Sequence, residues 1–248
     1  MFLVQLQQFE PLLDATSLLT QISKDADVRF TAFMLSLIAS HTSPRFVATL
    51  QMSCRLFTNY SVDHYYSSKV SLESFHDAML DGGSFSSMSI HVLESRQQMI
   101  LRYENPSSND PPLHLELPLS PPQAESLGQV EYGKFFTVNS KVLRKIIKEL
   151  PLFHDDLVRV AATSTRVKFS IASKEITVTK ESGNCRIVGY EGEDETELHI
   201  TFRPMMFFLN FTYKANRVWF YKTTNSQSVI SVPAFGMYGQ YVVYFPKL

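Results

Sequence analysis

The sequence predicts an α+β protein made of two similar domains in tandem, each with antiparallel sheets and two helices. Along most of the chain apolar and polar residues alternate, as they do in antiparallel strands with one buried and one solvated face. Four segments instead space their apolar residues for one face of a helix. The first and third begin at residues 9 and 141, which are 132 positions apart, and the second and fourth begin at residues 71 and 204, which are 133 apart. Nearly equal offsets indicate one structural plan used twice.

The first domain is predicted over residues 1–117 and contains the first two helices, 9–22 and 71–80. Their apolar faces consist of Leu12, Ala15, Leu19 and Ile22 and of Leu72, Phe75 and Met79. Serine often caps a helix and glycine often ends one, so we expect Ser71 to start the second helix and Gly82-Gly83 to stop it. The strand pattern is clearest at Met88, Ile90 and Val92 and at Leu113, Leu115, Leu117 and Leu119.

Residues 118–133 are predicted to connect the two domains. Ser120-Pro121-Pro122 opens this stretch, and proline pairs beside small polar residues are typical of loops. Leu127 is apolar, which a solvated linker does not require. On composition alone, an extended interdomain connector and a plain exposed loop remain open alternatives.

The second domain is predicted over residues 134–248, with its first helix at 141–150. Ser140 can cap this helix. Proline is favoured at the first helical position, so the other helix is expected to start near Pro204. The apolar residues of the two helices are Val142, Leu143, Ile146, Ile147 and Leu150, then Phe207, Phe208 and Phe211. Strands are expected at Val167, Phe169 and Ile171 and at Leu198, Ile200 and Phe202.

Helix 141–150 also carries a basic stripe, which is the set Lys141, Arg144, Lys145 and Lys148. These residues lie at i, i+3, i+4 and i+7, so they share one helix face opposite the apolar face. Four cations on one face repel one another unless a polyanion or an acidic neighbour offsets them. Contact with DNA phosphates and an ordinary solvated face remain open alternatives on spacing alone.

The sequence contains no motif for catalysis, for metal binding or for cofactor binding. It has no Gly-rich phosphate loop, no Gly-x-Ser-x-Gly turn and no His-Glu-x-x-His pair. Cys54 and Cys185 lie far apart, which favours reduced thiols over a disulfide or a zinc site. We therefore expect a protein that is not an enzyme, with no catalytic residues, metal or cofactor. The formal net charge of −1 provides no overall basic field, so any contact with DNA requires a local patch.

No apolar run approaches the roughly 20 residues of a membrane helix, and the N-terminus lacks the basic start of a signal peptide. We expect a soluble intracellular protein that does not bind membranes.

Several short segments occur in the order that one protein family has. They are Glu125–Gly128 and Tyr132, then Thr163–Ser170, Leu198–Phe202, Phe207–Phe211, Lys214, Ala215, Ala234–Gly239 and Val243–Leu248. In this order they resemble the proliferating cell nuclear antigen (PCNA) family of DNA sliding clamps. The resemblance is best from Tyr132 to the C-terminus and weaker before it. The order of the segments, together with the internal offset, makes the case, since no single segment is as specific as a zinc-finger spacing.

The resemblance implies the DNA clamp fold, with three subunits closing a ring, here a homotrimer, whose helices line the hole. It implies a nuclear processivity factor for DNA replication and repair that a clamp loader places on double-stranded DNA without sequence preference. The implied DNA-binding residues are Lys141, Arg144, Lys145, Lys148 and Lys214. A groove for short peptide motifs of DNA polymerases, nucleases and ligases is implied at Ile38, His41, Leu127, Tyr132, Phe245, Pro246 and Lys247. Lys168 falls where the family has a modifiable lysine.

The first two helices depart from the family pattern because neither contains lysine or arginine. In a clamp, this domain would face DNA with Thr16, Gln21, Glu73 and Asp77 instead. A subunit of the related heterotrimeric DNA-damage checkpoint clamp is therefore the alternative. The lopsided charge favours that alternative, whereas the short length and the Pro246-Lys247-Leu248 ending favour the PCNA type. The tail also departs from the family pattern, since it stops at Leu248 without the family's usual acidic extension. A third alternative, an α+β enzyme with an unrecognised site, predicts a concave pocket with convergent polar groups.

Overall fold

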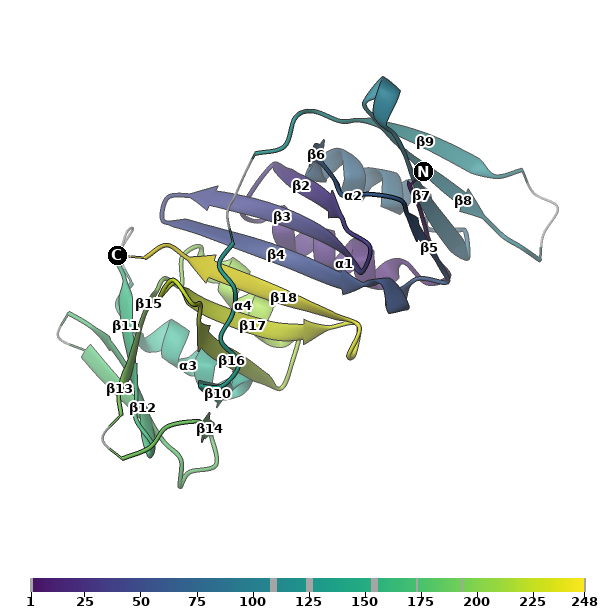
Figure 1. The fold of residues 1–248 in the computed structure, drawn as a ribbon. Coiled ribbons are helices and arrows are strands. Elements are labelled where there is room, and N and C mark those ends of the chain that lie inside the picture. The colour runs from purple at the N-terminus through teal and green to yellow at the C-terminus, as the bar shows by residue number, and fades with distance from the viewer. Residues whose placement is uncertain are drawn as a thin grey trace. The chain divides into compact units, whose positions relative to one another are not determined.

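The computed structural model describes residues 2–107, 111–123, 127–152, 156–172, 174–192 and 194–247. These residues form an α+β fold of antiparallel sheets and α-helices (Figure 1). The chain divides into two compact units, and each takes chain from three separate stretches. Unit 1 comprises Met1–Ser40, Thr49–Glu125 and Phe235–Gln240, and unit 2 comprises His41–Ala48, Ser126–Ala234 and Tyr241–Leu248. The predicted domains 1–117 and 134–248, by contrast, are each a single stretch.

Unit 1 contains two α-helices and most of the first nine strands. The elements are β1 (Phe2–Leu6), α1 (Glu10–Leu19), β2 (Asp25–Phe30), β3 (Met34–Thr42), β4 (Arg45–Ser53), η1 (Cys54–Leu56), β5 (Asn59–Val62), β6 (Tyr66–Ser71), α2 (Leu72–Asp81), β7 (Ser87–Leu93), η2 (Glu94–Arg96), β8 (Gln98–Glu104) and β9 (Leu113–Pro118). Its strands are ordered β5-β1-β7-β8-β9 in one sheet and β4-β3-β2-β6 in another stretch of sheet. Alternating residues such as Val4 and Ile90, which face each other across β1 and β7, are buried.

Unit 2 repeats this plan with the remaining elements. They are β10 (Phe135–Asn139), α3 (Ser140–Glu149), β11 (Val158–Ala162), β12 (Arg166–Ile171), β13 (Lys174–Thr179), β14 (Cys185–Val188), β15 (Thr196–Ile200), α4 (Met205–Tyr213), β16 (Arg217–Lys222), β17 (Ser228–Ala234) and β18 (Gly239–Phe245). One sheet is ordered β13-β12-β11-β15, and the other strands are ordered β14-β10-β16-β17-β18. In sequence, both sets run strand, α-helix, five strands, α-helix, three strands. The helix offsets predicted such a repeat, and the order of the elements is the same in both sets.

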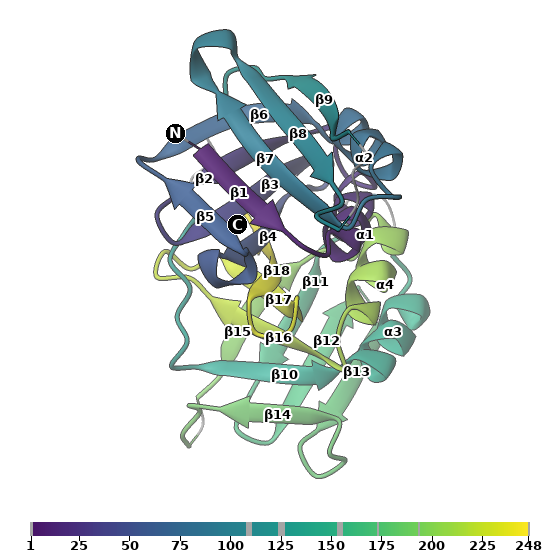
Figure 2. The same ribbon diagram turned by 90° about the vertical axis from the view of Figure 1, so that its right-hand side faces the viewer.

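Each unit packs its two α-helices against each other. Figure 2 shows α1 beside α2 and α3 beside α4. The apolar faces predicted for these helices are buried, with Leu12 and Phe75 at 1% exposure in unit 1 and Leu143 and Phe207 at 1% in unit 2. Aromatic rings fill much of the unit 2 core, where Phe46 contacts Phe207, Phe208 and Phe245 with ring centroids 5.4–6.0 Å apart.

The helix ends confirm some predictions and correct others. Ser71 caps α2 by accepting a hydrogen bond from the Ser74 N–H at 3.2 Å, as expected. Ser140 does not cap α3, because it is already the first helical residue and Asn139 accepts the capping hydrogen bond. Pro204 is the residue before α4 rather than its first residue. The first helix ends at Leu19, and Ile22 follows it in a turn.

Candidate functional site

The basic stripe lies on α3, and the local sequence explains how it reaches solvent. Asn139 accepts a hydrogen bond from the Lys141 N–H at 2.9 Å and so fixes the start of the helix. The buried side of α3 consists of Ser140, Leu143, Ile146 and Ile147. On the opposite side Lys141, Lys145 and Lys148 are exposed, and none of them pairs with a carboxylate in the part of the chain that the structure describes. Three ammonium groups with no carboxylate partner among the described residues leave this face able to bind an anion.

Arg144 has a different environment from the three lysines. It is half-buried, and its Nη1 donates to the Thr212 carbonyl at 3.2 Å and lies 3.4 Å from Thr212 Oγ1. Its Cζ lies 4.1 Å from the centroid of the Tyr213 ring, within the range of a cation–π contact. The sequence placed Arg144 with the lysines as a phosphate contact, whereas the structure commits much of its guanidinium group to α4.

The end of α4 adds to the surface beside the stripe. Lys214, which the sequence predicted to face DNA, is exposed at the C-cap of α4. Tyr213 is 66% exposed and Met206 is 60% exposed, and their separation of seven residues places them on one face of the helix. Sequence reasoning missed both residues because Phe-rich α4 was read only as core. We call the set Lys141, Lys145, Lys148, Met206, Tyr213 and Lys214 the α3–α4 surface.

The corresponding helices of unit 1 present the opposite charge. Their exposed acidic side chains are Glu10, Asp14, Glu73, Asp77 and Asp81. Glu73, Asp77 and Gln21 are exposed, as expected for residues that would face a partner. Thr16 is a correction, because it is completely buried and its Oγ1 donates to the Leu13 carbonyl at 2.9 Å. A buried hydroxyl that already donates within its own helix offers nothing to DNA.

A pocket of about 300 Å³, which we call the tail pocket, lies beside the end of β18 in unit 2. It is lined by Thr42, Ser43, Pro44, Arg45, Leu157, His199, Phe245 and Pro246. Phe245 and Pro246 were predicted groove residues, and the structure brings them together with the turn at 42–45. His41 supports that turn, since its ring stacks on Phe46 and its Nδ1 lies 2.8 Å from the Pro44 carbonyl oxygen.

His199 is a pocket residue that the sequence analysis did not identify. Its Nε2 lies 2.9 Å from Glu197 Oε1, and its backbone N–H donates to Ser228 Oγ at 2.9 Å. Glu197 also contacts Arg159, with 2.6 Å between Oε2 and Nη2. This hydrogen bonding holds the Arg159 pKa above its usual value, mainly through Glu197. The lining of the pocket thus includes the apolar side chains of Leu157, Phe245 and Pro246 together with the imidazole of His199.

The predicted connector is bound to the surface of unit 2 over residues 127–131. The Gly128 N–H donates to Gln227 Oε1 at 3.1 Å, and the Glu131 N–H donates to the Lys222 carbonyl at 2.9 Å. Leu127 is partly buried and packs with Val130 and Tyr221 against the cluster of Val229, Val242 and Tyr244. The solvated-loop alternative therefore does not describe this segment. Ala124, Glu125 and Ser126, which belong to the same predicted connector, lie outside the described residues.

The predicted groove residues do not form one continuous site. Successive residues of a strand point to opposite faces, so Tyr244, which contacts Leu127, and Phe245, which lines the tail pocket, lie on different faces of β18. Tyr132 is 61% exposed and its ring meets the edge of Tyr221 at 5.5 Å. Burial, with Tyr132 as a smaller cause, raises the pKa of Tyr221 to about 12. Lys247 is exposed, whereas Ile38 is buried in β3 within unit 1 and lines no part of the tail pocket.

Lys168, the predicted modification site, projects from β12. Its side chain is 33% exposed, and its Nζ lies 3.1 Å from Glu175 Oε2 on the neighbouring strand β13. An ion pair this exposed is weak and readily opened.

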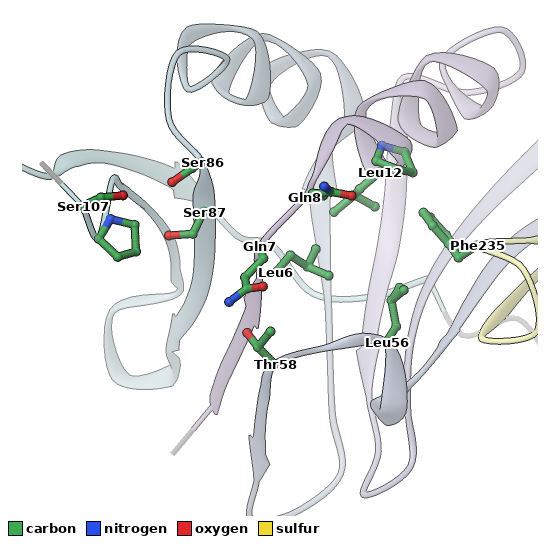
Figure 3. Close-up of a pocket in the computed structure, with 12 residues that line it drawn as sticks. Leu6, Gln7, Gln8, Leu12, Leu56, Thr58, Ser86, Ser87, Ser107 and Phe235 are labelled. Carbon is green, nitrogen blue, oxygen red and sulfur yellow. The ribbon is translucent and has the colours of Figure 1, made fainter.

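Unit 1 contains a larger pocket, of about 720 Å³, that no sequence signal indicated (Figure 3). The hydroxyl groups of Ser86, Ser87 and Ser107 lie toward one end of it, and Leu56 and Phe235 lie toward the other. Its remaining lining residues are Leu6, Gln7, Gln8, Pro11, Leu12, Thr58 and Pro106. None of the lining side chains is charged. Ser87 Oγ donates to the Glu104 carbonyl, and Thr58 Oγ1 to the Gln5 carbonyl, so these hydroxyls have no side-chain base to activate them.

Within the described residues, no group of three or more His, Cys, Asp or Glu side chains could hold a metal ion. No helix among them has the length and apolar character needed to cross a bilayer.

No protein-family model matches this chain, and no curated protein sequence matches it.

Proposed function

We propose that the chain is a subunit of a ring-shaped DNA sliding clamp of the PCNA type. In this role it encircles duplex DNA in the nucleus, is placed there by a clamp loader, and tethers polymerases and other replication and repair proteins. It contributes surfaces for DNA and for partner peptides, and it catalyses no reaction itself.

The repeated element order is the observation that carries the proposal. Both sets of elements run strand, α-helix, five strands, α-helix, three strands, and each unit packs its helices as a side-by-side pair. A closed ring can be built from one small unit used many times. A chain with two such units supplies six helix pairs in a trimer, three of them basic and three acidic.

The α3–α4 surface supports duplex DNA as the molecule inside the ring. Lys141, Lys145 and Lys148 present mobile ammonium groups, which contact phosphates as point charges and do not read bases. Contacts of this kind are independent of sequence, and they can be exchanged from one phosphate to the next. Both properties are required of a protein that slides.

Two edge strands support closure of the ring. β9 ends one sheet of unit 1 and β13 ends one sheet of unit 2, and each has six residues. An unpaired edge strand is a ready template for a strand of another chain. Their exposure patterns are the same, with alternate residues turned inward and the inward residues Leu113, Leu115 and Ile176 only half-buried. Pairing β9 of one copy with β13 of the next would cover these apolar groups and close a head-to-tail ring.

The tail pocket and the connector support recruitment of partner proteins. An apolar pocket of about 300 Å³ is large enough for one or two anchoring side chains of a short peptide motif. The connector at 127–131 forms a second contact region, across β18 from the pocket. In this proposal Tyr132 and Lys247 lie at the rim of these contact regions. Lys168, which is half-buried on β12, serves as a site of covalent modification.

The acidic helices of unit 1 favour a second candidate, the heterotrimeric checkpoint clamp. A homotrimer would place three acidic helix pairs, with Glu73 and Asp77 on each, in the same ring as three basic ones. In a heterotrimer, basic residues of the other two subunits would offset this charge. The native mass of the purified protein, which is considered in the Discussion, separates the two.

DNA binding by the isolated protein tests the proposal. Lys145→Glu combined with Lys148→Glu should weaken binding to a labelled duplex at least tenfold. It should also lower the slope of log affinity against log salt concentration by about 2, since each phosphate contact contributes about one unit. Fluorescence anisotropy at a series of salt concentrations measures both quantities.

Lys180→Glu combined with Arg186→Glu is the matched control, because it makes the same change of charge at exposed residues of unit 2 that belong to neither α3 nor α4. This control should reduce binding much less. If the Lys145 and Lys148 reversal leaves affinity and salt slope unchanged, the basic stripe is an ordinary solvated face and the DNA-facing role is wrong.

A further inference from the structure

An exposed aromatic ring lies within the α3–α4 surface, and phosphate contacts do not account for it. Tyr213 is 66% exposed at the end of α4, directly before Lys214. Met206, which lies seven residues earlier on the same face of α4, is 60% exposed. Attraction between the lysines and phosphates does not require large apolar side chains. The exposure of Met206 and Tyr213 beside these lysines therefore needs another explanation.

Arg144 determines how this ring is presented. Two contacts to Thr212, at 3.2 and 3.4 Å, hold the guanidinium group, and its Cζ lies 4.1 Å from the Tyr213 ring centroid. One face of the ring is therefore covered by a fixed planar cation. The large exposed fraction of Tyr213 leaves the other face open to solvent.

The lysines of the basic stripe lie on both sides of Arg144, the residue that contacts the Tyr213 ring. Lys141 lies one helical turn before Arg144, and Lys148 lies one turn after it, on the same face of α3. Surfaces that bind single-stranded nucleic acid combine a positive track for the backbone with aromatic rings on which bases stack. An acidic peptide would satisfy the lysines, but it would make no use of an open ring face supported by a guanidinium group.

We propose that Tyr213, positioned by Arg144, stacks an unpaired nucleobase of single-stranded nucleic acid whose phosphates contact Lys141, Lys145 and Lys148. The inference rests on the proposed function for the phosphate contacts and adds a second substrate to the same surface. Bases in an intact duplex expose only their edges, so the ring has no stacking partner there. It gains one at an end, a gap or a junction, where bases are unpaired. The surface then distinguishes such sites from continuous duplex.

The test compares two labelled oligonucleotides of equal length, one of thymidine and one that is abasic throughout, so that both carry the same phosphates. Tyr213→Ala should lower affinity for the thymidine strand at least fivefold, because stacking on an aromatic side chain contributes about 1–3 kcal/mol per base. It should leave affinity for the abasic strand and for duplex DNA unchanged. Tyr213→Phe retains the ring and should bind the thymidine strand like the natural protein.

Tyr65→Ala is the matched control, since Tyr65 is 60% exposed and belongs to unit 1 rather than to the α3–α4 surface, and the change should have no effect. If Tyr213→Ala weakens the thymidine and abasic strands equally, or weakens neither, the stacking role is wrong. The two proposals fail separately. Loss of duplex binding on reversal of Lys145 and Lys148, with no base-dependent effect of Tyr213→Ala, would remove only the stacking role. If the reversal of Lys145 and Lys148 leaves the affinity for duplex DNA unchanged, the DNA-facing role is wrong, whatever the effect of Tyr213→Ala.

Discussion

At the scale of single residues, the buried ring of Tyr103 explains why position 82 is a glycine. It ends α2 with a φ of −77°, a conformation that any residue adopts, so backbone freedom does not explain the glycine. A Cβ at this position would lie 2.2 Å from Tyr103 Cε1. The Tyr103 ring is fully buried and its hydroxyl donates to the Ala78 carbonyl at 2.7 Å, so the ring cannot move aside without losing that bond.

We therefore expect Gly82→Ala to destabilise the protein by about 1–3 kcal/mol, the usual cost of overpacking a core. Gly83→Ala is the control, because its Cβ would meet only the Leu80 carbonyl oxygen, at 3.0 Å. Urea denaturation of both variants measures the difference as a shift of the midpoint at constant slope. Equal losses in the two variants would show that Tyr103 does not set the requirement.

Residue-level predictions from the sequence succeeded where spacing alone decides the environment and failed where a distant residue decides it. The spacing of Lys141, Lys145 and Lys148 was sufficient to place them together on the exposed face of α3. Arg144 shares that spacing, but its role depends on Thr212 and Tyr213, which are far away in sequence. The burial of Thr16 likewise depends on α2, where His76 Nδ1 lies 3.2 Å from its hydroxyl.

At the scale of elements, the connector is irregular in structure yet firmly placed. Its backbone pairs with the hairpin that joins β16 and β17, and Leu127 seals a hydrophobic cluster on one face of β18. Sequence composition could identify this stretch as a connector because of its prolines. Composition could not reveal where the connector binds, because the cluster that Leu127 covers is formed by residues about 100 positions later in the chain.

For peptide binding, we expect Leu127→Ala combined with Pro246→Ala to lower affinity at least tenfold. The probe is a labelled peptide with one glutamine, one aliphatic and two aromatic residues at the spacing of the family's motif. Both changes remove apolar area that such anchors would bury. Leu80→Ala combined with Pro121→Ala removes similar exposed groups in unit 1 and is the control. Unchanged affinity in the first double variant, with circular dichroism confirming its fold, would count against the groove.

At the scale of the whole molecule, the proposed ring depends on two edge strands. β9 and β13 each leave one side of a sheet unpaired, and Ile176 is half-buried on the inward side of β13. The purified protein should have a native mass of three chains if it forms a homotrimer. A stable single chain would instead indicate the heterotrimeric alternative, in which the edges pair with other subunits.

Ile176→Glu should convert the trimer to single chains, because it places a charge among the apolar groups that association would bury. Thr177→Glu adds the same charge on the opposite, exposed side of β13 and should preserve the trimer. Light scattering of both variants measures the mass. A trimer that survives Ile176→Glu in a folded protein would show that β13 is not the contact.

The interleaving of the two units has a consequence for synthesis on the ribosome. Unit 1 includes residues 235–240, and the Ser53 N–H donates to the Tyr238 carbonyl at 2.7 Å. Unit 2 includes Phe46, whose ring packs against Phe207, Phe208 and Phe245, all of which are synthesised much later. Unit 1 is therefore not complete before residues 235–240 have been synthesised, so it cannot finish folding as an N-terminal domain ahead of unit 2. Until then its apolar surface, and that around Phe46 in unit 2, remains open to aggregation.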